Sequence, residues 1–184
     1  MRQARRITTD YNPRFFSRTK RYRYRLLLDR VRHPLERTQA WRVGWKLDLD
    51  LLRREASLIE GTHDFAAFRS QECQSKTSVR RLERIKVRRT GDYVWLEITA
   101  NAYLHHMVRN IVGTLIAVQR AAEPAAAMAR VLVGRDRRMA GVTAPAAGLY
   151  LWHVEYPPVY GIPAPQLDGA PAGAWLMQPA GLLR

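Results

Sequence analysis

The sequence has one cysteine, Cys73, in 184 residues. A single cysteine excludes a disulfide within the chain and any zinc site built from several cysteines. No apolar run approaches the ~20 residues that a membrane-spanning helix needs. The basic stretch 1–10 has no apolar segment behind it, so no secretory signal is predicted. These absences favour a cytoplasmic protein without a membrane partner or a structural metal.

Acidic residues are also scarce, with 16 Asp and Glu against 31 Lys and Arg, which gives a formal net charge of +15. A surplus of this size favours a polyanionic partner such as a nucleic acid. Only four of the 31 cations are lysines. The preference for arginine carries less weight than the net charge, because the base composition of a gene readily alters the choice between the two cations.

Several segments alternate with the two-residue period of a strand. From Tyr22 onward, Tyr22, Tyr24 and Leu26 share one face and arginines occupy the other. Residues 82–99 have the pattern of a hairpin that turns near Gly91, and a last strand is expected at Leu149–Tyr156.

Other segments have helical spacing. Residues 48–60 predict a helix, and residues 103–118 predict the clearest one, since apolar side chains from Leu104 to Leu115 recur at i, i+3, i+4 and i+7. A shorter helix is expected to begin at Glu123-Pro124. The order of elements predicts an α+β fold, with an antiparallel or mixed sheet and helices on one face. We expect one domain over residues 1–160 and an irregular tail rich in Pro, Gly and Ala over 161–184.

Four segments, in order along the chain, look like the motifs of one known family. They are residues 10–24, with Arg14-Phe15 and Arg21-Tyr22-Arg23-Tyr24; residues 63–69 (His-Asp-Phe-Ala-Ala-Phe-Arg), followed by Cys-Gln-Ser at 73–75; residues 101–113 (Asn-Ala-Tyr-Leu-His-His-Met-Val-Arg-Asn-Ile-Val-Gly); and residues 144–151 (Ala-Pro-Ala-Ala-Gly-Leu-Tyr-Leu). Over about residues 10–160 the chain resembles the C-terminal part of the TruA family of tRNA pseudouridine synthases.

The resemblance implies an isomerase that converts uridines in the anticodon stem-loop of tRNA to pseudouridine. It implies a reaction without a cofactor and an aspartate nucleophile in a segment resembling Gly-Arg-Thr-Asp-Ala-Gly. It also implies two related half-domains around a basic cleft in a homodimer. This chain matches the C-terminal half of the pseudouridine synthase fold, together with the strand that connects the halves.

Two residues match catalytic positions of the family. Tyr22 matches the tyrosine on which the flipped base stacks, and its hydroxyl offers a group for proton transfer. The alternative for Tyr22 is an ordinary strand aromatic packed on a helix, a role we expect for Tyr24. Arg109 matches the arginine that pairs with the aspartate and lowers the pKa of that carboxyl. The alternative for Arg109 is a solvated surface arginine.

Further cations are expected to contact RNA. For the neighbouring histidines a metal site is the weaker reading, because adjacent side chains on a helix diverge and no Cys, Asp or Glu nearby completes a ligand set. Arg69 lies in a matching loop, where it could touch RNA. The residues assigned to RNA binding are Arg14, Arg21, Arg23, Arg69, His105 and His106.

The aspartate motif itself is missing. Eight aspartates occur, and none lies in an Arg-Thr-Asp-Ala-Gly segment. Asp136 follows Gly134-Arg135, but Ala140-Gly141 is too far along the chain to complete the motif. The first hypothesis is a tRNA pseudouridine synthase represented by an incomplete chain that is inactive alone. The alternative is a basic RNA-binding module without catalysis, or a truncated remnant.

Phosphate contacts predict a salt-dependent affinity for tRNA. The logarithm of the binding constant should fall linearly with the logarithm of salt concentration, with a slope set by the number of contacts. Replacing Arg14 with alanine (Arg14→Ala) should lower the affinity and reduce the slope by about one contact. Filter binding or fluorescence titration over a salt series measures both quantities. Binding that does not respond to salt would contradict the phosphate-based interface.

Overall fold

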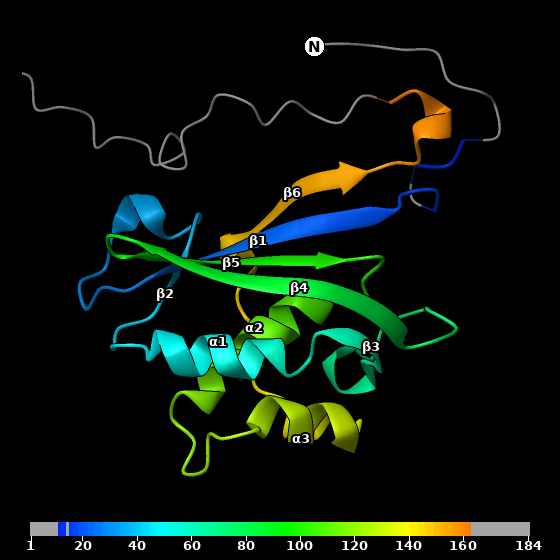
Figure 1. Ribbon diagram of the computed structural model, residues 1–184. Helices are drawn as coiled ribbons and strands as arrows, with labels where there is room; N and C mark the ends of the chain where they lie inside the picture. The colour runs from blue at the N-terminus through cyan, green and yellow to red at the C-terminus, as the bar shows by residue number, and fades with distance from the viewer. Residues whose placement is uncertain (1–10, 14, 163–184) are drawn as a thin grey trace, which may run out of the picture.

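Three helices lie against one face of a six-stranded mixed sheet (Figure 1). The computed structural model describes residues 11–13 and 15–162, and all structural statements refer to these residues. The predicted α+β class, with the helices on one face, is confirmed. The predicted tail at 161–184 falls almost wholly outside the described residues, so the domain boundary stays a prediction.

The sheet is built around β1 (Thr19–Leu27). On one side β1 pairs antiparallel with β5 (Tyr93–Ala100), and on the other with β6 (Leu149–Glu155). The two-residue β2 (Trp41–Arg42) runs parallel to the end of β1 and makes the sheet mixed. β4 (Val79–Thr90) pairs with β5, and β3 (Gly61–Asp64) pairs with the start of β4.

The predicted alternation along β1 is confirmed. Tyr24 and Leu26 are fully buried beneath the helices, whereas Arg21 and Arg23 remain half-exposed. Arg25 is an exception to the solvated basic face, because it is buried, with its guanidinium 4.0 Å from the centre of the Tyr93 ring. The strand therefore separates two chemically different faces of the sheet.

The β4–β5 hairpin is also confirmed. Gly91-Asp92 forms its two-residue turn, and Gly91 has φ of 58°. A side chain at that position would strain the backbone, which accounts for glycine there. The strands extend slightly beyond the predicted 82–99.

Helix α1 (Leu49–Ser57) begins where the sequence predicts. The Asp48 side chain accepts hydrogen bonds from the backbone N–H groups of Asp50 and Leu51, both at 2.9 Å. Such a cap satisfies donors that the first turn of a helix leaves unpaired. The short 3-10 turns elsewhere are Pro34–Glu36, Ala66–Phe68, Arg137–Met139, Ala146–Gly148 and Pro158–Tyr160.

Two predicted helix starts are wrong. Helix α2 (Met107–Val118) begins four residues after position 103, because His106 adopts a left-handed conformation with φ of 62°. Helix α3 (Ala127–Gly134) begins after the predicted Glu123-Pro124. The buried Glu55 of α1 accepts hydrogen bonds from the N–H groups of Ala126 (2.7 Å) and Met128 (2.9 Å), and this distant cap sets the start.

Helix α2 is buried around almost its whole circumference. Its core side includes Met107, Ile111 and Leu115, all with no exposed surface. A helix that is apolar on all sides belongs between layers of a protein. The sheet covers one side of α2, and the chain that returns from α3 toward β6 covers another. The position of α2 therefore fixes everything attached to its first turn.

Truncating Ile111 should measure how much this burial stabilises the domain. Ile111→Ala is expected to lower the free energy of unfolding by about 2–5 kcal/mol, because it removes buried methyl groups and leaves a cavity. Val133 on α3 is 79% exposed, so Val133→Ala is the control and should change stability by less than about 0.5 kcal/mol. Equal effects of the two changes in urea unfolding would contradict the packing described.

Candidate functional site

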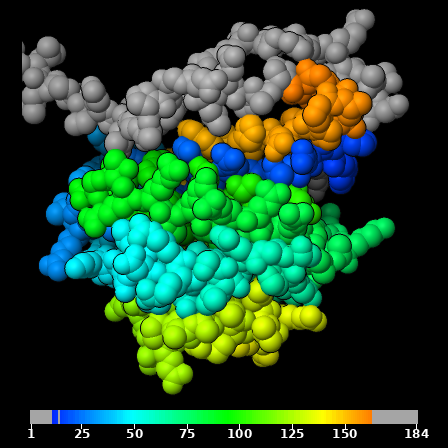
Figure 2. Space-filling model, in the orientation of Figure 1, coloured from blue at the N-terminus to red at the C-terminus, as the bar shows by residue number. Residues whose placement is uncertain are grey.

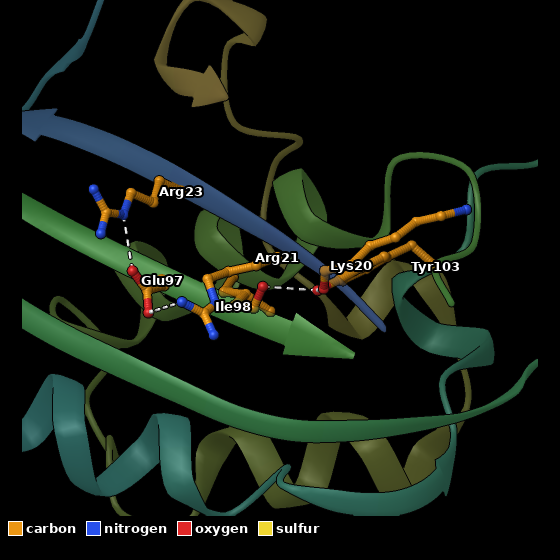
Figure 3. Close-up of polar contacts among 6 residues, drawn as sticks. All are labelled: Lys20, Arg21, Arg23, Glu97, Ile98 and Tyr103. Carbon is orange, nitrogen blue, oxygen red and sulfur yellow. Dashed lines mark hydrogen bonds and ion pairs between the residues drawn. The ribbon is translucent and has the colours of Figure 1, made fainter. Parts of the chain in front are cut away.

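The segment that joins β5 to α2, residues 101–106, contacts both predicted catalytic residues, Tyr22 through Tyr103 and Arg109 through His106. Its Tyr103 hydroxyl lies 2.7 Å from the carbonyl oxygen of Ile98 and 3.0 Å from that of Lys20 (Figure 3). Burial raises the pKa of the Tyr103 hydroxyl well above its usual range, so the group stays a proton donor. These two contacts anchor the ring between β1 and β5.

Tyr22 packs against Tyr103 of this segment. Its ring meets the Tyr103 ring edge-on, with centroids 5.0 Å apart and an interplanar angle of 88°. The side chain is half-buried, and its hydroxyl makes no hydrogen bond to any described residue. Burial raises the pKa of the Tyr22 hydroxyl, so it is protonated at neutral pH. A fixed, partly exposed ring with an unused hydroxyl is suited to stacking on a base and to proton transfer.

Tyr24 has the structural role predicted for it. It is fully buried, and its hydroxyl donates a 2.6 Å hydrogen bond to the carbonyl oxygen of Pro145. Gly148 lies so close to the Tyr24 ring that an added Cβ would come within 2.8 Å of it. The motif at 144–151 thus closes over the buried ring of β1.

Arg109 lies in the first turn of α2 and is half-buried. Its Nε donates to the carbonyl oxygen of Ala144 at 2.6 Å, and its Nη1 lies 3.2 Å from Nε2 of His106. Arginine only donates, so His106 must accept and be neutral. Burial, with the nearby His105 and Arg109, lowers the pKa of His106 and favours that state. No carboxylate of the described residues is within ion-pair distance of Arg109.

Arg69 and the two histidines, His105 and His106, lie near the start of α2. The His105 and His106 ring centroids are 4.0 Å apart, and Arg69 donates from Nη2 to the carbonyl oxygen of Cys73 at 3.0 Å. The N–H of His105 contacts the Cys73 sulfur at 3.4 Å. With the positive end of the α2 dipole, these groups make a region suited to an anion. Arg14 lies outside the described residues.

Arg21 and Arg23 lie on the opposite face of β1 from Tyr22. Both approach the Glu97 carboxylate, at 3.6 and 2.8 Å (Figure 3), and Arg23 also stacks over Trp152 at 3.6 Å. The Arg21 and Arg23 side chains are 33% and 28% exposed, so a phosphate could approach both from solvent. The predicted RNA-binding residues therefore divide between two faces of the sheet.

Asn110 is a hub that the sequence motif contains but sequence reasoning did not single out. It is 1% exposed. Its Nδ2 donates to the carbonyl oxygen of Phe68 at 2.8 Å, and its Oδ1 accepts from Thr143 at 2.7 Å and from Arg137 at 3.3 Å. The polar amide beside Ile111 in an otherwise apolar helix could have indicated this role, because a buried amide requires hydrogen-bond partners.

Residues 141–144 run directly over the backbone of α2. A Cβ added at Gly113 would overlap the carbonyl oxygen of Val142, and one added at Gly141 would come within 2.7 Å of the carbonyl oxygen of Gly113. The Ala144 N–H donates back to the carbonyl oxygen of Arg109 at 3.2 Å. Absence of side chains at both glycines is what allows this approach.

Two classes of site find no support in the described part of the chain. No group of three or more His, Cys, Asp or Glu side chains there is arranged to hold a metal ion. None of the helices described has both the length and the apolar character of a membrane span. The space-filling view instead shows a solid stack of layers, with β1 and β6 on one side and α3 on the other (Figure 2).

Fold and geometry together define a basic α+β domain whose motif residues meet at the start of α2. A family model described as tRNA pseudouridine synthase matches residues 56–157. The proteins named tRNA pseudouridine synthase A of Paraburkholderia phymatum and Burkholderia lata are 45% and 47% identical to the chain over 161 and 164 residues. The chain therefore belongs to the tRNA pseudouridine synthase family, as its motifs predicted. The alignments cover 88% of the chain and about 60% of the length of these relatives.

The close approach of residues 141–144 to α2 predicts the sign of the stability change when Gly113 is replaced. In an exposed helix, replacing glycine with alanine stabilises by about 0.5–1 kcal/mol. Gly113→Ala should instead destabilise the domain by about 1–3 kcal/mol, because the new methyl group overlaps the Val142 carbonyl. The control is Gly134→Ala at the end of α3, where the neighbour is the end of the half-exposed Met139 side chain, which can change rotamer, rather than backbone. Stabilisation by Gly113→Ala in thermal unfolding would contradict the contact.

Proposed function

We propose that the protein containing this chain is a tRNA pseudouridine synthase acting on uridines of the anticodon stem-loop. Family membership supports the reaction, and the structural observation that carries it is that Tyr22 contacts Tyr103 and Arg109 contacts His106, two residues of segment 101–106. The reaction is an isomerisation, in which the bond from ribose C1′ to N1 of the base breaks and a bond from C1′ to C5 forms. The proton lost from C5 is balanced by one gained at N1, so no cofactor is required.

Tyr22 is proposed to receive the base after it leaves the helical stack. A base inside a stem is inaccessible to a nucleophile, so it must be flipped into a pocket. The Tyr22 ring is braced by Tyr103, which is itself held between β1 and β5. The protonated hydroxyl of Tyr22 has no other partner among the described residues and is available to the flipped base.

Arg109 is proposed to pair with the nucleophilic carboxylate. An arginine close to an aspartate favours its ionised form, which is the nucleophile. The Nε of Arg109 is already used by Ala144 and its Nη1 by His106, which leaves Nη2 without a partner among the described residues to meet an incoming group. We propose that this aspartate comes from a segment resembling Gly-Arg-Thr-Asp-Ala-Gly that this sequence does not contain.

Two of the described aspartates, Asp64 and Asp136, have structural roles. Asp136 pairs with Arg138 at 2.7 Å and also accepts the Arg138 backbone N–H. Asp64 accepts the backbone N–H of Ala66 at 3.0 Å and lies 3.5 Å from Arg135. These contacts support the view that neither serves as the nucleophile.

We further propose tRNA as the partner, a homodimer as the assembly and the cytoplasm as the location. The formal charge of +15 supports a polyanionic partner. The second candidate is a non-catalytic RNA-binding module, which the missing aspartate motif favours. Arg69, His105 and His106 serve either function, because phosphate contacts do not depend on catalysis.

The decisive assay is release of tritium from C5 of labelled uridine in unmodified tRNA. Residues 1–184 alone are expected to release none, because no described carboxylate reaches Arg109. A chain extended by a segment with the aspartate motif is expected to be active. Robust release by the unextended chain would show that one of its own aspartates is the nucleophile.

Within the active extended chain, Tyr22→Phe and Arg109→Ala should each impair turnover more than tRNA binding. The reason is that both side chains act on the flipped base or the nucleophile, whereas most affinity comes from the RNA backbone. Binding without turnover in every extended form would instead support the non-catalytic module.

A further inference from the structure

We infer that Arg137 is a positioning residue for Arg109. Arg137 does not contact the proposed site; it holds the strip of chain that fixes the Arg109 guanidinium. This inference rests on the role proposed above for Arg109, and it adds a residue that neither the sequence motifs nor the family comparisons single out.

Arg137 binds four neutral acceptors on that strip and on α2. Its Nη1 donates to the carbonyl oxygens of Gly141 (3.0 Å) and Ala140 (3.3 Å). Its Nη2 lies 3.1 Å from the Thr143 hydroxyl oxygen and 3.3 Å from Oδ1 of Asn110. Among the described residues, no carboxylate pairs with this guanidinium. Its planar fork therefore serves as a clamp, a geometry that the single ammonium group of lysine does not reproduce.

The clamp acts on the residue next to the Arg109 contact. Thr143 also donates from its hydroxyl to Asn110 at 2.7 Å, and the following residue, Ala144, bonds twice to Arg109. The Ala144 carbonyl oxygen accepts from Arg109 Nε at 2.6 Å, and the Ala144 N–H donates to the Arg109 carbonyl at 3.2 Å. The clamped residue is thus the immediate chain neighbour of the residue whose carbonyl orients the guanidinium.

The second end of the strip is fixed as well. The Gly141 N–H donates to the Thr114 hydroxyl at 3.0 Å, and that hydroxyl donates to the Asn110 carbonyl at 2.7 Å. Arg137 is the only side chain described that bonds both ends of the strip, at Gly141 and at Thr143. Without it, the strip keeps its separate bonds from Gly141 to Thr114 and from Thr143 to Asn110, but loses the one side chain that links these two points.

Orientation matters because Arg109 has few fixed contacts. Its Nε is held by Ala144 and its Nη1 by His106, so loss of the Ala144 contact leaves the plane of the guanidinium free to rotate about its side chain. A group that pairs with a nucleophile must be held in a narrow range of geometry, and small displacements cost far more in rate than in binding.

The first experiment follows Arg109 directly in the 184-residue chain. Exchange of the Arg109 Nε proton with water is measured by NMR in Arg137→Met and Thr143→Val. Both variants should accelerate this exchange by about tenfold or more, since each removes part of the network that keeps the Nε–H bonded. Arg138→Met is the matched control, because the Arg138 side chain is exposed and its partner within the described part of the chain is Asp136, which does not touch the strip. Unchanged exchange in both test variants would overturn the inference.

The second experiment measures turnover and tRNA affinity in the extended, active chain. Arg137→Met should lower kcat by about 10–100-fold and change the Kd for tRNA no more than Arg138→Met does. Arg137→Lys should recover only part of kcat, which a role of positive charge alone does not predict. If Arg137→Met does not fold, Thr143→Val, which removes one hydroxyl, decides the matter by the same two readouts.

Arg109→Ala separates the two proposals. If Arg109→Ala leaves kcat unchanged, the role proposed for Arg109 is wrong whatever Arg137 does. If Arg109→Ala abolishes turnover while Arg137→Met and Thr143→Val keep full kcat, the role of Arg109 stands and the positioning role of Arg137 is wrong.

Discussion

Direct contact between the backbone of α2 and the backbone of residues 141–144 determines how this domain is assembled. Gly113 and Gly141 allow it, because a Cβ at either position would collide with main-chain atoms of the other segment. Close approach of two backbones also removes their polar groups from water, and these groups then need partners. Thr114 supplies them from α2, because its hydroxyl accepts from the Gly141 N–H and donates to the Asn110 carbonyl oxygen. Arg137 supplies them from the other side, where it donates to the carbonyl oxygens of Ala140 and Gly141.

The same contact links the core to the candidate site. The strip that crosses α2 continues into Ala144 and Pro145, whose carbonyl oxygens accept hydrogen bonds from Arg109 and Tyr24. Tyr24 belongs to β1, two residues from Tyr22. One stretch of chain therefore sets the relation between the helix that carries Arg109 and the strand that carries Tyr22. Packing and chemistry are not separable in this part of the molecule.

The sequence predicts those features that depend on local periodicity. The alternation in β1, the hairpin that turns at Gly91 and the Asp48 cap of α1 follow from neighbouring residues and were confirmed. The starts of α2 and α3 were mispredicted, because they depend on the left-handed His106 and on Glu55, more than 70 residues from the helix that it caps. Tyr22 and Arg109 were assigned by family resemblance alone, and the polar hub at Asn110 needed tertiary contacts to be seen.

We propose that Tyr22 and Arg109 face one site, on the helix side of β1, that receives a uridine of the RNA. An NMR titration of the labelled chain with an anticodon stem-loop RNA tests it most directly. If the two residues share that site, the largest shifts are expected at the Tyr22 ring and the Arg109 Nε–H, with smaller ones at the Trp152 indole on the opposite face. Shifts confined to the Arg23–Trp152 face, with Tyr22 and Arg109 unchanged, would contradict it.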